Sequence, residues 1–191
     1  MKRIMLAVAG MLSVASAVEA QATYLTLPND QLIARAVLAA PAGAGRDGAA
    51  VVKWNADNTY TQIKEGSGTL VCYDHSGGPG EQPFAVQCTN PGNLPRVQQN
   101  YQIEAQAAGD RDRLRTLLQA AETNGTRVQP VFGSVWISFS GNDQASAGRH
   151  TTIAMPGATQ ATTGFPDNRN AGGAYIMDAG TSTAHLMIPG N

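Results

Sequence analysis

The sequence predicts an α+β fold with a mainly antiparallel sheet, two or three helices and one disulfide bond. Some segments repeat apolar residues at the spacing of an amphipathic helix, whereas several short segments alternate like strands and are separated by turn residues. The helical segments do not alternate regularly with the strand segments, as a parallel sheet with crossover helices requires. These observations favour helices and strands that are grouped separately along the chain.

Residues 1–20 have the composition of a signal peptide. Two basic residues precede an uncharged apolar run of about 15 residues, which is shorter than the roughly 20 residues that span a bilayer. Small residues then place a cleavage site after Ala20 or after Ala22. We therefore expect residues 21–191 to form a single exported domain, periplasmic or secreted, with no membrane span in the mature chain.

The composition excludes some classes of partner. The 191 residues carry a formal net charge of −1, and only 14% of them are charged. Proteins that bind nucleic acid usually present a strongly basic face, so we expect no nucleic-acid partner. A hydrophobic content of 42% is too high for a disordered polar chain. We therefore expect a globular domain.

The first part of the mature chain predicts one helix followed by strands. Apolar residues recur at helical spacing from Leu32 to Ala40, and Asn29 and Asp30 are suited to cap a helix that follows Pro28. The expected strands cover residues 50–54, 59–64 and 69–73, with a short fourth piece at 84–88. Because the first three are closely spaced, we expect them to form an antiparallel meander.

The middle of the chain predicts two helices. A weak helical pattern follows Pro95 and includes Val97, Tyr101 and Ala105, and the pair Gly109-Asp110 breaks it. Asp110 is suited to cap a second helix, which an Asn-Gly pair ends. The apolar stripe of this second helix consists of Leu114, Leu117, Leu118 and Ala121.

The last third of the chain returns to strands. One strand is expected at 130–139, and its alternation puts Trp136, Ser138 and Ser140 on one face of the sheet. The next strand covers residues 150–155.

A long loop and a hairpin complete the predicted fold. Residues 156–173 are rich in glycine, proline and asparagine, and a loop of this length in a compact domain is usually functional or mobile. Strands at 174–177 and 184–188 then form a hairpin around Gly180.

Cys72 and Cys88 are the two cysteines of the chain. An even pair in an exported protein favours a disulfide, and closing a loop of about 15 residues contributes roughly 3 kcal/mol. A metal site is the alternative, because His75 follows Cys72 by three residues. Structural zinc usually has four ligands in two close pairs, and Cys88 has no such neighbour. We predict the disulfide, with His75 on the surface.

The sequence contains no phosphate-binding loop, dinucleotide fingerprint, zinc-protease helix or serine-hydrolase elbow. His150 opens one predicted strand, and His185 lies inside the last one. If these strands are neighbours, the two imidazoles could bind a divalent metal or act as acid and base, with Asp178 or Asp143 as a further ligand or orienting group. The alternative is that each histidine has a structural role.

Several patches of the sequence carry a resemblance. Residues 172–188 read GGAYIMDAGTSTAHLMI, residues 64–72 read KEGSGTLVC, and a second cysteine and a strand that begins with His150 follow. This combination resembles a group of secreted, uncharacterised bacterial proteins, although a tryptophan of that pattern is missing between residues 68 and 72. The resemblance implies one exported domain with these landmarks and implies no activity.

Three functions follow as expectations. The first is a domain that binds a small molecule or an envelope protein without catalysis, because catalytic signatures are missing and no cofactor is evident. Its candidate pocket residues are Trp136, Tyr175 and Met187. The second is a histidine-centred enzyme, with or without a metal, that uses His150 and His185 under a lid formed by residues 156–173. The third is an inhibitor or envelope-interaction protein that uses an exposed edge strand.

Overall fold

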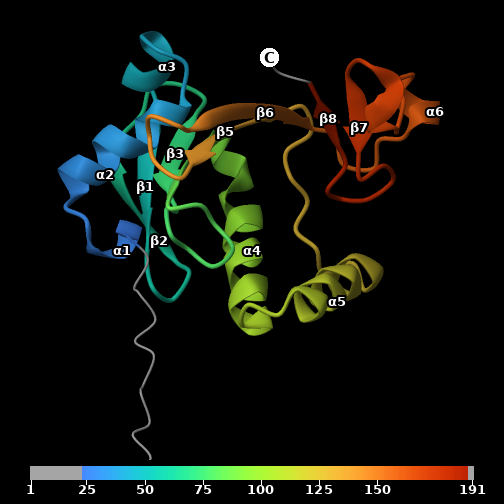
Figure 1. Cartoon of the computed structure of the whole chain (residues 1–191), viewed down its shortest axis with the longest axis horizontal. Coiled ribbons are helices and arrows are strands. Elements are labelled where there is room, and N and C mark those ends of the chain that lie inside the picture. The colour runs from blue at the N-terminus through green and yellow to red at the C-terminus, as the bar shows by residue number, and fades with distance from the viewer. Residues whose placement is uncertain (1–22, 189–191) are drawn as a thin grey trace, which may run out of the picture.

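The computed structural model describes residues 23–188 and confirms the α+β class, with eight strands in one sheet. The strands are β1 (Ala50–Trp54), β2 (Tyr60–Lys64), β3 (Val71–Asp74), β4 (Phe84–Thr89), β5 (Val135–Gly141), β6 (Gly148–Ala154), β7 (Tyr175–Met177) and β8 (His185–Met187). Their order across the sheet is β2-β1-β3-β4-β5-β6-β8-β7 (Figure 1). Every neighbouring pair is antiparallel except β1 and β3.

The predicted number of helices is wrong. The described residues form six α-helices, namely α1 (Thr23–Thr26), α2 (Asn29–Ala36), α3 (Ala44–Asp47), α4 (Leu94–Ala107), α5 (Arg111–Thr123) and α6 (Gln160–Thr163). Three short 3-10 helices are η1 (Val37–Ala39), η2 (Pro91–Asn93) and η3 (Arg169–Ala171). The helices α1, α3 and α6 have four residues each, which is too short for an apolar repeat to reveal them.

The predicted meander of the first three strands is also wrong. Strand β1 lies between β2 and β3, and it pairs with β3 in parallel. All four residues of β3 are buried, whereas the first three residues of β2 are exposed. The more apolar strand therefore takes the interior position, and the polar β2 becomes an edge of the sheet.

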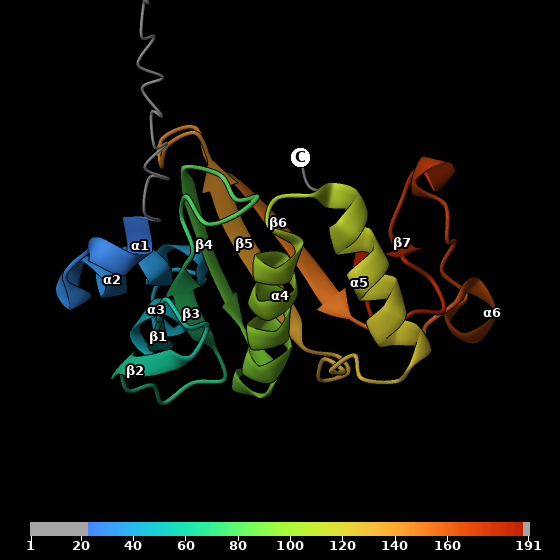
Figure 2. The ribbon, with the colours of Figure 1, turned by 90° about the horizontal axis from the view of Figure 1, so that it is seen from below.

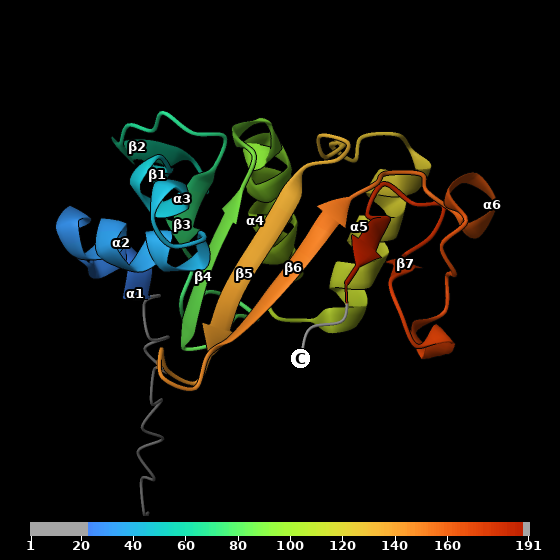
Figure 3. The same ribbon diagram turned by 90° about the horizontal axis from the view of Figure 1, so that it is seen from above.

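The helices form layers on the two faces of the sheet. One face packs against α2 and η1 through a core that includes Ala36, Ala39, Val51 and Val86. The other face packs against α4 through a second core around Trp54. Figure 2 shows α4 and α5 together on this second face, and Figure 3 shows α2 and α3 on the opposite one. Within residues 23–188, no helix is long and apolar enough to cross a membrane.

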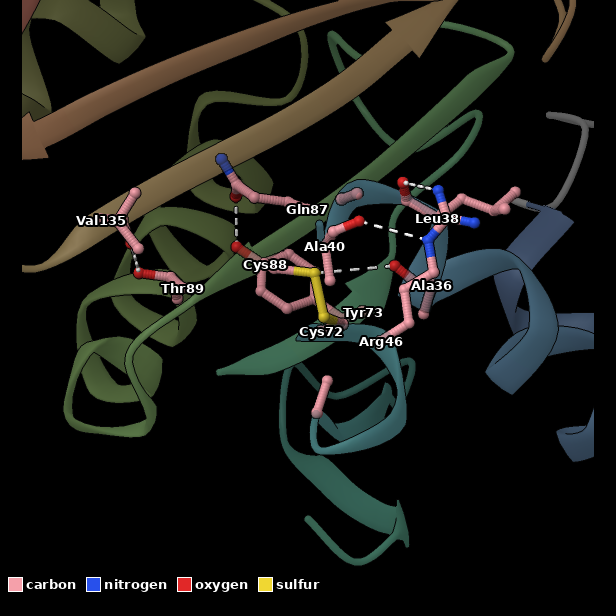
Figure 4. The surroundings of a disulfide bond; sticks show 12 residues. Ala36, Leu38, Ala40, Arg46, Cys72, Tyr73, Gln87, Cys88, Thr89 and Val135 are labelled. Carbon is pink, nitrogen blue, oxygen red and sulfur yellow. Dashed lines mark hydrogen bonds between the residues drawn. A yellow bond between two sulfur atoms is a disulfide. The ribbon is translucent and has the colours of Figure 1, made fainter. Parts of the chain in front are cut away.

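The predicted disulfide is confirmed. Cys72 on β3 lies directly opposite Cys88 on β4, and their Cα atoms are 4.0 Å apart. Both cysteines are fully buried, and Figure 4 shows the bridge beside Ala36. The metal alternative at Cys72 is thereby excluded, because its sulfur is bonded to Cys88.

The predicted N-cap of α5 is confirmed, whereas the predicted N-cap of α2 is wrong. The Asp110 carboxylate accepts hydrogen bonds from the backbone N–H groups of Asp112 and Arg113, as expected for an N-cap. Pro28 instead occupies the N-cap of α2, with no side-chain cap, and Asn29 is already helical.

The C-terminal region has its own small core. Ala158, Ile176 and Ala184 pack together at the end of the sheet formed by β7 and β8. The predicted loop 156–173 contains α6 and η3, so it is more ordered than its composition indicates. The side chains of Thr159 and Thr162 form a capping box at the start of α6.

Candidate functional site

A cleft of about 400 Å³ lies on the α4 face of the sheet. Its floor comes from β4, β5 and β6, and its walls come from α4, the segment that follows α5, and the residues that lead into β8. The lining residues that carry the following argument are Arg96, Arg127, Trp136, Thr183 and His185. The volume is within the range of small-molecule sites, which is about 300–1,000 Å³.

The floor of the cleft is polar because of the alternation in β5. Trp136, Ser138 and Ser140 face the cleft, and Ile137 and Phe139 face the other side, as the sequence predicts. Thr152 on β6 lies opposite Trp136 and also lines the cleft. The floor therefore offers one indole surface and a set of hydroxyl groups.

Arg96 forms one wall of the cleft and is almost fully buried, with 4% of its surface exposed. Its Nη1 donates to the Val128 carbonyl at 2.5 Å and to Ser182 Oγ at 2.8 Å. Its Nη2 donates to Thr183 Oγ1 at 2.8 Å. Three of its five N–H groups are thus used, and every acceptor is uncharged.

Arg127 lies beside it and is 7% exposed. Its Nη1 donates to Gln99 Oε1 at 2.7 Å, and its Nη2 donates to Asn100 Oδ1 at 2.5 Å. Its Nε is buried and has no hydrogen-bond partner in the part of the chain that the structure describes. Gln99 also binds the backbone of Thr126 and Val128, so α4 holds the whole segment that carries Arg127.

Among residues 23–188, no carboxylate lies at ion-pair distance from either guanidinium group. The ion pairs in residues 23–188 involve other side chains, namely Arg35–Asp74, His75–Glu81 and Arg115–Asp112. Burial and then the charge of Arg127 lower the pKa of Arg96 to about 10, and Glu122 opposes this shift. Burial also lowers the pKa of Arg127, which Glu122 and Glu104 oppose. Both groups remain protonated at neutral pH, so the wall of the cleft is cationic.

His75 is buried, and its predicted surface position is wrong. Its Nδ1 lies 3.0 Å from Glu81 Oε1, and its ring meets the edge of Tyr73. His75 directly follows β3, and its backbone N–H donates to the Ala85 carbonyl on β4 at 3.0 Å. A segment that looks like an exposed loop in the sequence therefore stays beside the sheet, and His75 lines the cleft. His75 Nε2 is buried, and no residue from 23 to 188 forms a hydrogen bond with it.

The structure does not bring His150 and His185 together. Strands β6 and β8 are neighbours, as the hypothesis requires, and both side chains belong to the same face of the sheet. The register, however, sets His185 opposite Ala154, four residues along β6 from His150. At about 3.3 Å per residue, the two positions are roughly 13 Å apart along the strand. His185 lines the cleft, and His150 is exposed outside it.

The acidic candidates do not complete a histidine centre either. Asp178 is exposed in the turn between β7 and β8, and Asp143 is held by Ser146 in another turn. Neither forms an ion pair with a histidine in the described part of the chain. No three His, Cys, Asp or Glu side chains among residues 23–188 gather as a metal site would need. The arrangement therefore gives no support to a metal centre at His150 and His185.

The three candidate pocket residues lie in one row across the sheet. Trp136 pairs with Thr152, Thr152 with Met187, and Met187 with Tyr175. Trp136 lines the cleft, whereas Tyr175 and Met187 continue the row toward the sheet edge, outside the lining. Residues 156–173 do not contribute to the lining, so they do not form a lid over this cleft.

Sequence reasoning missed both arginines of the cleft. Arg96 lies in the first turn of α4, between the buried residues Leu94 and Val97. A cation between two apolar residues is the one feature of the sequence that could have indicated its burial. Arg127 follows the end of a helix, where an exposed cation is the ordinary expectation. Their burial depends on partners far along the chain, such as Ser182, which is 86 residues from Arg96.

The comparisons found no match to this chain among protein families, curated proteins or solved structures. The resemblance of its C-terminal pattern to secreted bacterial proteins therefore stays a prediction.

Proposed function

We propose that this protein is exported and binds a small organic anion in the cleft, without transforming it. The observation that carries the proposal is the pair of buried guanidinium groups, Arg96 and Arg127, which line one cleft with no carboxylate of the described chain at ion-pair distance. A buried charge is unfavourable unless it is paired and hydrogen-bonded. An anionic ligand would supply the missing charge.

The lining beside the two arginines fits a small ligand with one anionic end, and Glu81, the carboxylate that also lines the cleft, is paired with His75. Trp136 offers an apolar surface, and aromatic side chains contribute strongly to binding when a ligand covers them. The hydroxyls of Ser140 and Thr152 form no hydrogen bond with another residue of the described chain, so both are available to a ligand. The disulfide is compatible with an oxidising compartment, which supports export.

The test is calorimetric titration of the mature protein at low salt with phenylacetate, phenyl phosphate and the neutral analogue phenylacetamide. We expect at least one anion to bind and the amide to bind about 10-fold to 100-fold more weakly, which corresponds to the 1.5–3 kcal/mol of a charge-assisted hydrogen bond. Arg127→Gln should lose most of this preference, and Arg127→Lys should keep part of it.

Arg111→Gln is the matched control, because Arg111 is exposed on α5 and lies outside this cleft. It should bind the anion as the wild type does. Equal affinity for the acid and the amide would contradict the proposal, and so would the absence of binding by both anions at millimolar concentration.

A further inference from the structure

His185 is placed at the wall of the cleft by strand β8. It lies opposite Ala154 on one side and Met177 on the other, and it is half-buried. Ala154, Thr183 and His185 all line the cleft. The imidazole is therefore on the cleft face of the sheet and remains within reach of a bound molecule.

The tautomer of His185 follows from its hydrogen bond. Its Nδ1 lies 2.7 Å from the carbonyl oxygen of Thr183. A carbonyl oxygen only accepts, so Nδ1 carries the proton, and Nε2 of the neutral ring has a free lone pair. No group in residues 23–188 donates to this Nε2. The ring is thus held in one orientation, with an unused acceptor.

Thr183 connects this imidazole to the cationic wall. Its side-chain hydroxyl accepts from Arg96 Nη2 at 2.8 Å, and its carbonyl accepts from His185 Nδ1 at 2.7 Å. Ser182, the preceding residue, is held by both Arg96 and Glu122. These hydrogen bonds hold residues 182–183 in place, and they therefore fix the position of the His185 imidazole relative to the Arg96 guanidinium group.

We infer that the ligand of the cleft is a hydroxy acid whose carboxylate binds at the Arg96–Arg127 wall and whose hydroxyl donates to His185 Nε2. This inference rests on the proposed function and adds the second recognition group. A hydroxyl fits better than an ammonium group, because the two guanidinium charges repel a cation. His75 Nε2 also lacks a partner, but it is shielded from solvent and a ligand cannot reach it without rearrangement.

The test compares two ligands that differ by one hydroxyl group, mandelate and phenylacetate, by calorimetric titration at pH 8. We expect one enantiomer of mandelate to bind the wild type about fivefold more tightly than phenylacetate, since one neutral hydrogen bond contributes about 1 kcal/mol. The variant His185→Asn keeps a donor toward the Thr183 carbonyl but removes Nε2. It should bind both ligands with the affinity that the wild type has for phenylacetate.

His150→Asn is the matched control, because His150 lies on the same face of the sheet but outside the cleft. It should keep the preference for mandelate. Equal affinities for the two ligands in the wild type, or a preference that survives in His185→Asn, would overturn the inference while the anion site stands. If neither acid binds and phenyl phosphate does not bind either, the proposed function itself fails, and the inference fails with it.

Discussion

Arg96 connects three parts of the protein that are distant in sequence. From the first turn of α4 it reaches the backbone of Val128 and the hydroxyls of Ser182 and Thr183. All of these acceptors are uncharged, and among residues 23–188 no carboxylate forms an ion pair with Arg96; Glu122, which binds the same Ser182 hydroxyl, compensates its charge only in part. This distinguishes Arg96 from Arg35, which is ion-paired with the buried Asp74 on the opposite face.

Glu104 makes the stability of the protein depend on pH. Burial, and then repulsion by Glu81, raises its pKa from 4.5 to about 7, although His75 and Arg127 act in the opposite direction. The folded protein therefore keeps the proton on Glu104 in a range where the unfolded chain has released it. Rising pH between about 4.5 and 7 consequently lowers the contribution of this group to stability.

We expect Glu104→Gln to be more stable than the wild type at pH 8, by about 1 to 2 kcal/mol after allowance for solvent screening, and similar to it at pH 4. Urea denaturation at the two pH values measures the difference. Glu65→Gln, at an exposed position in the turn after β2, is the control and should show no such dependence. If the wild type is as stable as Glu104→Gln at pH 8, ionisation of Glu104 does not destabilise the folded protein, and this prediction is contradicted.

The disulfide joins two interior strands and ties β3 to β4 at the centre of the sheet. Replacing both cysteines, in Cys72→Ala/Cys88→Ala, should lower the free energy of unfolding by about 3 kcal/mol, because the unfolded chain regains the freedom of a loop of about 15 residues. Urea denaturation with and without reductant measures this effect. The reductant should destabilise the wild type and leave the double variant unchanged. A wild type that reductant does not affect would contradict this estimate.

Most strand positions were predictable because alternation is a local property, although the strand expected at 130–139 begins only at Val135 and ends at Gly141. The expected strand at 50–54 coincides with β1, and the faces assigned to Trp136 and Ser138 are correct. Strand order was not predictable, because the position of β1 between β2 and β3 depends on which strand is buried on both faces. The register that separates His150 from His185 is a non-local property of the same kind.

The cleft was only partly predictable for a similar reason. Trp136 and His185 are visible as candidates in the sequence, since an aromatic residue and a histidine on strands are conspicuous. Arg96 and Arg127 are candidate ligand-binding residues because they are buried. This burial arises when α4 packs against the sheet and the segment 126–128 forms hydrogen bonds with Gln99. A charged residue in a helix gives no sign of such burial.

The molecule is a sheet with a core on each face and a polar cleft on the α4 face. Its proposed role depends on export. The predicted signal peptide and its cleavage sites lie outside the described residues. We expect protein recovered from the cell envelope fraction or the medium to begin at Gln21 or Thr23, and intact-mass measurement with N-terminal sequencing would show this. The same mass should fall below that of the reduced chain by the mass of two hydrogen atoms, because forming one disulfide removes two hydrogens. A full-length chain retained in the cytoplasm with free thiols would contradict export.

The most direct test of the central claim is a crystal structure of the mature protein with phenylacetate, or phenyl phosphate if that anion binds more tightly. The account predicts an anionic oxygen of the ligand about 3 Å from a guanidinium nitrogen of Arg96 or Arg127, with the phenyl ring against Trp136. A ligand bound elsewhere on the protein, or an empty cleft at a concentration that saturates binding in solution, would contradict it.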